Sequence, residues 1–312
     1  MIELFPGLRA LRAFDAAATH LSFTRAADDL AVTPAAISHQ IKELEGQLGV
    51  ALFARTSRSM RLTREGEILH TAAHESLEVL SRALMRIKRL ENRMQIRVSA
   101  SPSLAAKWLV PRLDRFLRLQ PGADVRVDVS HAPVDFDRED IDVAIRFGEG
   151  RYPGLRADLL FQDNVFPVCS PAIIKDKPLR TPRDLLKHTL IHLDWEAQGS
   201  PWPNWKMWMK AAGIEDFDDR AGLHFGQTSY AVQAAIDGMG VALGDSNLVA
   251  DDLAAGRLIK PFDLSLRAPR HFAYYLITRP DGLETPLVAA FRDWCQAEAL
   301  ATERKGAEMT AT

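Results

Sequence analysis

The sequence predicts an α/β protein that begins with an all-α winged helix-turn-helix head. Three observations support this fold class. Apolar residues recur at helical spacing near the start of the chain, a stretch free of proline and glycine lies between Gly66 and Arg93, and strand-like and helical patterns alternate from Ile96 onward. With 312 residues the chain exceeds one ordinary domain of roughly 100–200 residues, so two or three folded units are expected.

The head is predicted to contain three short helices. The apolar positions of the first two are Leu8, Leu11, Phe14 and Ala18, then Phe23, Ala26, Ala27 and Leu30. After the three-residue connection 31–33, Thr33 can cap a third helix and Pro34 suits its first position. The buried face of the third helix is marked by Ile37, Ile41, Leu44 and Leu48. Two helices joined by so short a turn are typical of the helix-turn-helix motif.

The outer face of the third helix carries residues suited to reading DNA. The helical repeat places Ala35, Ser38, His39 and Lys42 on the side away from the apolar face. Ser38 and His39 can reach base edges, Lys42 can reach a phosphate, and Ala35 can contact a thymine methyl group. The alternative is an ordinary three-helix bundle whose outer face is only solvated.

An arginine-rich segment follows the third helix. Between Gly46 and Arg64 the chain has four arginines and no acidic residue, which is the local charge that phosphate binding requires. Apolar and polar residues alternate around 52–53 and 60–63, which predicts a two-stranded wing. A solvated charged loop is the alternative. The predicted DNA-contacting residues are Thr33, Pro34, Ala35, Ser38, His39, Lys42, Arg55, Arg58, Arg61 and Arg64.

A long helix is predicted from Gly66 to about Arg93. Its apolar stripe has the spacing of a coiled-coil seam and consists of Ala73, Leu77, Leu80, Leu84 and Ile87. We expect the last four of these to pair with a second copy of the chain, since a dimer is also what a dyad-symmetric operator requires. The alternative is a helix that packs on its own domain. His70 and His74 on this helix resemble half a zinc site, but no third ligand is suitably spaced and we expect no metal.

The remainder of the chain predicts parallel sheets covered by helices, because strands alternate with helical stretches such as 104–119. Two strand-to-helix junctions carry hydroxyls, Ser101 with Ser103 before Leu104, and Thr228 with Ser229. Hydroxyls and free N–H groups at such junctions can hold an anion, although each junction alone can be an ordinary helix cap. Arg146 and Phe147 end another strand. Arg146 is a candidate partner for an anionic ligand, or else a structural ion pair. The predicted effector-binding residues are Ser101, Ser103, Leu104, Arg146, Phe147, Thr228 and Ser229.

Several classes of protein are disfavoured. Two distant cysteines, Cys169 and Cys295, indicate neither a disulfide framework nor a zinc site and fit a reducing compartment. No secretion signal and no run of about 18 apolar residues is present, so we expect a cytoplasmic protein without a membrane partner. The net charge of −2 gives no hint of nucleic acid by itself. No catalytic or cofactor motif is found, so an enzyme is not expected and no cofactor is expected. An exported solute-binding protein is also disfavoured, because a DNA-binding head would have no function in it.

The segment from Leu11 to Gly66 resembles the head of LysR-type transcriptional regulators. The shared pieces include Ser22 to Ala27, Ser38 to Ile41 and Leu62 to Gly66. The family often has glutamine at the position of Pro34 and arginine at that of His39. The stretches 142–148, 205–213 and 233–243 resemble the subgroup named for the glycine cleavage system activator.

The resemblance implies a two-lobed, periplasmic-binding-protein-like sensor domain. It places the DNA-binding domain at 1–65, the linker and dimerisation helix at 66–93 and the effector-binding domain at 94–300. Lobe I would comprise 94–163 and 269–300, lobe II 164–268, and a disordered tail 301–312. The implied partners are double-stranded DNA, RNA polymerase, a small-molecule effector, which we take to be a carboxylate, and further copies of the chain in a homodimer or homotetramer. The alternative is a ligand-independent DNA-binding regulator with a vestigial sensor domain.

Overall fold

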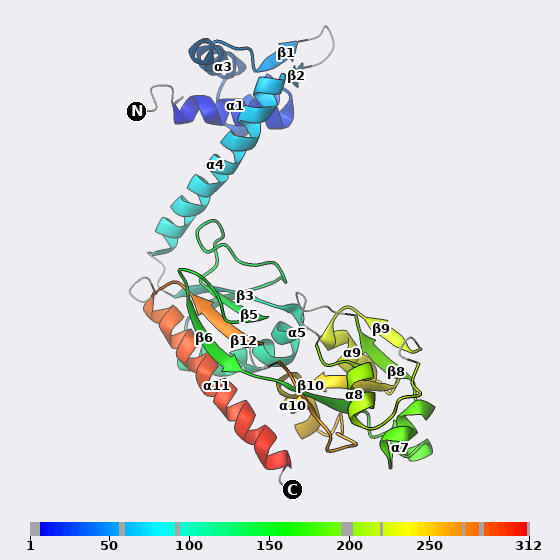
Figure 1. Ribbon diagram of the computed structural model, residues 1–312. Helices are drawn as coiled ribbons and strands as arrows, with labels where there is room; N and C mark the ends of the chain where they lie inside the picture. Colours follow the sequence, from blue (N-terminus) through cyan, green and yellow to red (C-terminus); the bar gives the residue numbers. More distant parts are fainter. Residues whose placement is uncertain are drawn as a thin grey trace. The chain divides into compact units, whose positions relative to one another are not determined.

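The computed structural model describes residues 7–55, 60–90, 94–194, 202–218, 221–269, 272–280 and 284–310 (Figure 1). It divides into two compact units, Met1–Glu91 and Asn92–Thr312. The fold class predicted from the sequence is confirmed: the first unit is a winged helix-turn-helix head with a long helix, and the second is a two-lobed α/β domain. Among the helices of the described ranges, none is long and apolar enough to cross a membrane.

Three helices form the head: α1 (Leu8–His20), α2 (Phe23–Asp29) and α3 (Pro34–Leu48). The predicted cap is confirmed, because Thr33 Oγ1 accepts a hydrogen bond of 3.2 Å from the N–H of Ala36 and Pro34 opens the helix. Gly49 ends α3 with φ of +71°, a conformation that costs a glycine little. The core between the helices contains Phe14, Ile37, Ile41 and Leu44. The apolar spacing in the sequence therefore placed all three helices correctly.

The wing consists of the antiparallel strands β1 (Phe53–Arg55) and β2 (Met60–Leu62). Glu45 ties it to α3, since its Oε1 accepts hydrogen bonds from the N–H groups of Leu52 at 2.8 Å and Phe53 at 3.3 Å. Thr63 donates from Oγ1 to the carbonyl of Ala51 at 2.7 Å and accepts from the N–H of Gly66 at 3.0 Å. The start of α4 (Arg64–Leu90) is thus bonded to the wing.

The second unit contains two five-stranded sheets. The sheet of lobe I has the order β4-β3-β5-β12-β6, and its strands are β3 (Gln95–Ala100), β4 (Asp124–Val129), β5 (Val143–Gly148), β6 (Arg156–Phe161) and β12 (Ala273–Thr278). The sheet of lobe II has the order β11-β7-β10-β8-β9, and its strands are β7 (Asn164–Cys169), β8 (Leu190–Leu193), β9 (Leu223–Phe225), β10 (Val241–Asp245) and β11 (Leu266–Arg267).

The expectation of parallel sheets is only partly right. Strand β3 is parallel to β4 and β5, and β8 is parallel to β9 and β10, but β12 runs antiparallel to β5 and β6 and β7 antiparallel to β10. The chain passes from lobe I to lobe II between β6 and β7 and returns between β11 and β12 (Figure 1). The strands that begin or end these two passages are the ones that pair antiparallel, so the sheets are mixed.

The helices of lobe II are α7 (Ile173–Asp176), α8 (Trp205–Ala211), α9 (Thr228–Ile236) and α10 (Ser246–Ala254), with a 3-10 turn over Pro182–Lys187. Lobe I carries α11 (Pro286–Thr310) and the helical stretch that the sequence predicted over 104–119. That stretch is broken into α5 (Pro102–Leu104), a π-helical turn Ala105–Leu109, a 3-10 turn Val110–Arg112 and α6 (Leu113–Leu119). Pro111 lies at the break, where its missing N–H removes one helical hydrogen bond.

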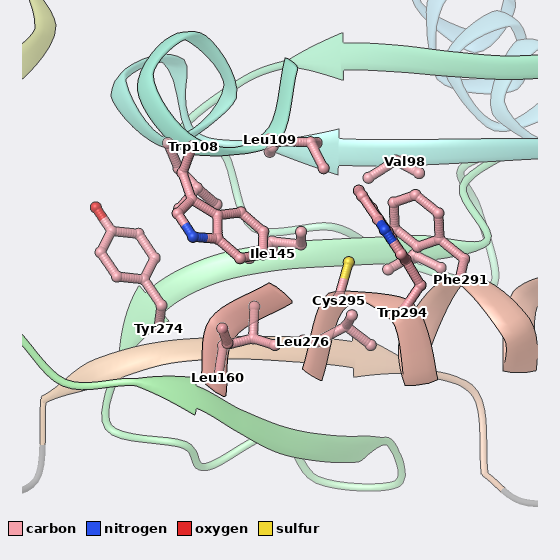
Figure 2. Close-up of a cluster of buried hydrophobic side chains, with 14 of the residues drawn as sticks. Val98, Trp108, Leu109, Ile145, Leu160, Tyr274, Leu276, Phe291, Trp294 and Cys295 are labelled. Atoms are coloured by element: carbon pink, nitrogen blue, oxygen red, sulfur yellow. The ribbon is translucent and has the colours of Figure 1, made fainter. Parts of the chain in front are cut away.

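The core of lobe I lies between its sheet and these helices. Figure 2 shows Trp108 and Leu109 in one apolar cluster with Ile145 of β5 and with Phe291, Trp294 and Cys295 of α11. The core also includes Leu248 of α10, although α10 follows a strand of lobe II. Helix α10 is thereby attached to lobe I, which fixes one side of the junction between the lobes.

Candidate functional site

The predicted DNA-reading residues of α3 lie on its open side. Thr33, Pro34, Ala35, His39 and Lys42 are exposed, whereas Ser38 is half-buried.

The structure describes the side chains of two of the four predicted arginines. Arg61 in β2 and Arg64 at the start of α4 are exposed. Arg55 ends β1, but its side chain is outside the described part of the structure, and Arg58 lies outside the described residues. Because Glu45 bonds the end of α3 to β1, the helix and the wing share one compact unit.

The apolar stripe of α4 divides into two parts. Ala73 is buried in the core of the head, and Leu77 is half-buried. Leu80, Leu84 and Ile87 are 48%, 61% and 60% exposed. The three exposed apolar side chains therefore remain available to a second copy of the chain.

A cavity of about 390 Å³ lies between the two lobes of the second unit. This volume is in the range of about 300–1,000 Å³ that small-molecule sites occupy. Five of the predicted effector-binding residues line it, namely Ser101, Ser103, Arg146, Phe147 and Thr228. The lining is completed by His131, Gly148, Leu193, Trp202, Gly226, Gln227, Asp245, Phe272 and Tyr274.

The two predicted junctions meet directly. Ser103 Oγ accepts a hydrogen bond of 3.0 Å from the N–H of Ser229 at the start of α9. Ser229 itself does not line the cavity, so the bond between the lobes is its contribution. Leu104 does not line it either, because its side chain is fully buried in the core of lobe I. The expectation that Leu104 contacts the effector is therefore replaced by a role in packing.

A second contact joins the lobes at the cavity. His131 follows β4, and its Nε2 lies 2.8 Å from Nε2 of Gln227, the residue before α9. The Ser103–Ser229 and His131–Gln227 bonds both connect lobe I to the N-terminal end of α9.

Arg146 lies at the cavity with its hydrogen-bonding capacity used internally. Its guanidinium, 8% exposed, donates to the carbonyl of Ser99 at 2.9 Å, to Ser99 Oγ at 2.6 Å and to the carbonyl of Ile145 at 3.0 Å. Its Nε and the other Nη2 hydrogen reach the carbonyl of Ala132 at 3.3 and 3.1 Å. The five N–H groups thus have acceptors, so Arg146 holds the backbone at Ala132 and contributes a positive potential, and none of these contacts is the ion pair that was the alternative. Burial lowers its pKa.

A buried carboxyl group was missed by the sequence analysis. Asp245 ends β10 and is 5% exposed at the cavity wall, with hydrogen bonds from Thr228 and Trp202. Its burial, and secondly the negative charge of nearby Asp163, raise its pKa well above the usual range. Asp163 accepts hydrogen bonds of 2.9 Å from the N–H and the amide of Asn247. The position of Asp245 at the C-terminal end of a strand was the signal that could have identified it.

An aromatic wall faces these polar groups. Phe147 contacts Trp202 with 4.7 Å between ring centroids and stacks on Phe272 at 5.6 Å. The hydroxyl of Tyr274 is hydrogen-bonded to Ser101, and burial together with the two nearby carboxyl groups raises the pKa of Tyr274. In Figure 2 this hydroxyl points away from the apolar core. The cavity thus combines hydroxyl groups with apolar rings, which is typical of sites for small organic molecules.

Known proteins share both units. The model of the bacterial regulatory helix-turn-helix protein of the lysR family matches residues 8–67, and that of the LysR substrate binding domain matches residues 90–300. The glycine cleavage system transcriptional activator of Escherichia coli (strain K12) is 41% identical over 306 residues, which cover 98% of each chain. The transcriptional activator AmpR of Pseudomonas aeruginosa is 38% identical over 300 residues, 96% of this chain and 97% of AmpR.

The solved effector domain of Pseudomonas aeruginosa AmpR is similar in structure. It has a TM-score of 0.53 and 30% sequence identity, and the match covers 67% of this chain and 98% of that domain. The head, the two-lobed domain and these matches agree over nearly the whole length. The chain therefore belongs to the LysR family of DNA-binding transcriptional regulators, in which a helix-turn-helix domain is joined to an effector-binding domain.

Proposed function

We propose that this regulator binds a dyad-symmetric operator as a dimer or tetramer and that a small carboxylate in the interlobe cavity changes its action on transcription. The observation that carries the effector proposal is the meeting of the two hydroxyl-bearing junctions in one cavity of suitable volume. RNA polymerase is the proposed partner in transcription, and the cytoplasm is the proposed location.

The chemistry of the cavity supports a carboxylate held by neutral donors. Ser101, Thr228 and Tyr274 supply hydroxyl groups to the cavity. Arg146 adds positive potential without a free N–H group. Asp245 is compatible with an anion because its raised pKa favours the uncharged form.

The DNA proposal is tested by footprinting on DNA from the native genome over a range of salt concentrations. Lys42→Ala should weaken binding to all sequences and reduce the salt slope by about one unit per bound copy, because one phosphate contact is lost. Ser38→Ala should instead relax sequence choice. Lys210→Ala, which removes an exposed lysine of α8 in the second unit, is the control and should change neither quantity. Unchanged operator binding by both head variants would contradict the assigned reading surface.

The effector proposal is tested by calorimetry with a panel of small carboxylates and their uncharged amides. A carboxylate should bind and the matching amide should not, and Thr228→Val should weaken the binding. If no compound of the panel both binds and alters the footprint, the result would favour a ligand-independent regulator.

A further inference from the structure

Two imidazoles and one carboxylate converge where α1 packs on α4. Nδ1 of His74 lies 3.0 Å from Oδ1 of Asp15, and Nε2 of His70 lies 3.4 Å from the same oxygen. The three potential ligand atoms all lie within 4.8 Å of one another. The spacing of four residues brings both histidines to one side of α4, and α1 supplies the carboxylate.

This arrangement adds a third potential ligand to the pair of histidines. His70 and His74 were set aside because no third ligand was spaced near them. Asp15 precedes His74 by 59 positions and is brought to it only by the packing of the two helices. The expectation of no metal therefore rested on distances along the sequence. The packing of α1 on α4 brings Asp15 close to His74 in space.

The distances suit a tetrahedral transition-metal ion. Zinc bonds to imidazole nitrogen and carboxylate oxygen at about 2.0–2.2 Å, which places neighbouring ligands of a tetrahedron about 3.3 Å apart. The separations of 3.0 and 3.4 Å between the carboxylate oxygen and the two nitrogens match that spacing. Two imidazoles with one carboxylate also form a ligand set that zinc, cobalt and nickel accept, with a fourth position left to water.

The surroundings are those that orient metal-binding histidines. The second ring nitrogen of His74 lies 3.7 Å from Oε1 of Glu78, longer than a hydrogen bond, so a small side-chain movement would be needed for this carboxylate to act as the outer partner of a ligating imidazole. The ring of His70 packs edge-on against Phe14 of the head core, with 6.3 Å between centroids. Asp15 and His70 have side chains 19% and 27% exposed, and His74 is 50% exposed, so an ion can enter from solvent.

We propose that Asp15, His70 and His74 form a binding site for a divalent transition-metal ion of the zinc type. The ion would join α1 of the helix-turn-helix motif to the helix that carries the exposed apolar stripe. Because the two helices separate when the head unfolds, the ion would bind the folded head in preference to the unfolded chain and stabilise it.

The experiment uses the full-length chain without an affinity tag, stripped of metal. Zn²⁺ is titrated by calorimetry, and Co²⁺ by its visible absorption, which reports the coordination geometry directly. The expected result is one site per chain, a tetrahedral Co²⁺ spectrum, and a higher melting temperature of the head when Zn²⁺ is added.

Variants separate this site from other ion binding. Asp15→Asn and His74→Gln should abolish the spectrum and the thermal shift, while Glu78→Gln should weaken binding by about 10- to 100-fold. The matched control is His20→Gln. His20 is the last residue of α1, lies outside the proposed site, and has Nε2 3.4 Å from Oδ2 of Asp29. His20→Gln should bind as the parent does. Circular dichroism of each metal-free variant checks that it folds.

Two results would overturn the proposal. One is a parent protein that takes up neither Zn²⁺ nor Co²⁺ while remaining folded. The other is uptake that persists with equal affinity and the same spectrum in both Asp15→Asn and His74→Gln.

Discussion

Single residues decide how the head is assembled, and two glycines show this in opposite ways. A Cβ atom on Gly66 would overlap the carbonyl oxygen of Leu52, the backbone group that leads into the wing. A Cβ atom on Gly46, inside α3, would meet nothing within 4 Å. Gly66→Ala should therefore destabilise the head by about 1–3 kcal/mol through overpacking. Gly46→Ala should stabilise it by about 0.5–1 kcal/mol, because glycine is the poorer helix former.

Native-state hydrogen exchange of the α3 amides measures both effects within the head alone. Each variant is the control for the other, since both replace glycine by alanine in a helix. If both variants changed the stability of the head by the same amount and in the same direction, the close approach of Gly66 to Leu52 would not be what limits the side chain at position 66.

Asp245 makes stability depend on pH. Its raised folded-state pKa means that the unfolded chain ionises first as pH rises. Between the ordinary aspartate pKa of about 3.9 and the raised value, the folded state binds more protons, so stability falls with rising pH. Asp245→Asn should remove this loss. Its melting temperature should exceed that of the parent near neutral pH, and the difference should vanish as pH falls to about 4.

Asp237→Asn is the control for Asp245→Asn, because Asp237 is exposed at the end of α9. Thermal scans of the three proteins over several pH values give the comparison. A difference between Asp245→Asn and the parent that does not depend on pH would contradict the raised pKa.

The serine and threonine residues of the cavity wall were among those named from the sequence. Ser101, Ser103 and Thr228 stand at strand-to-helix junctions, which are visible within a few residues of sequence. Asp245 and Tyr274 lie in β10 and β12, and their place in the wall depends on how strands far apart in the chain are ordered. Residue identity also could not show that the N–H groups of Arg146 donate to backbone carbonyls and to Ser99 Oγ.

At the scale of elements, α4 has the most exposed apolar surface to account for. Leu80, Leu84 and Ile87 follow each other along one side of α4, and Ile68 and Val79 are further exposed apolar residues of this helix outside that stripe. Burying each such side chain against a second copy is worth about 1.5–3 kcal/mol. Changing Leu80 and Leu84 together to Glu should therefore give a smaller species by light scattering and weaken operator binding.

Val79→Glu is the matched control for the stripe. Val79 is also apolar and 37% exposed on α4, but the helical repeat places it outside the stripe. The Val79→Glu variant should keep the same oligomeric state as the parent. An unchanged mass of the Leu80/Leu84 variant would mean that the chain pairs through another surface.

Strand and helix positions were predicted well, and strand direction was not. The strand-like pattern expected from Ile96 onward coincides with β3, which begins at Gln95. The antiparallel placement of β12 depends on the return of the chain from lobe II, which leaves no local pattern. The break in the 104–119 stretch was readable in principle, because Pro111 lies inside it.

At the scale of the whole sensor domain, lobe I forms ion pairs with α10 and hydrogen bonds with the N-terminal end of α9. Arg112 of lobe I pairs with Asp251 of α10 at 2.7 Å, and Lys107 with Asp252 at 3.2 Å. At the cavity, the described residues include two hydrogen bonds across the lobes, Ser103–Ser229 and His131–Gln227. A ligand at the cavity therefore acts beside these two hydrogen bonds and the ring contact between Phe147 and Trp202.

A ligand can change transcription only if it binds one arrangement of the protein more tightly than another. A coupling of about 1–3 kcal/mol corresponds to a 5- to 150-fold change in affinity, and it is reciprocal between effector and operator. Removing a hydroxyl that bonds a charged ligand costs about 1.5–3 kcal/mol. The double change Ser103→Ala and Thr228→Val should thus weaken carboxylate binding by about tenfold or more while the footprint on the operator stays the same.

The measurement pairs calorimetry of the carboxylate, with and without operator DNA, with transcription from the bound promoter. In the parent, the factor by which DNA changes carboxylate affinity should equal the factor by which the carboxylate changes DNA affinity. The double variant should retain operator binding and lose the response. Ser265→Ala, which removes a hydroxyl of lobe II outside the cavity lining, should behave as the parent. A normal response from the double variant would place the effector elsewhere, because neither hydroxyl at the meeting of the two lobes would then contribute to its binding.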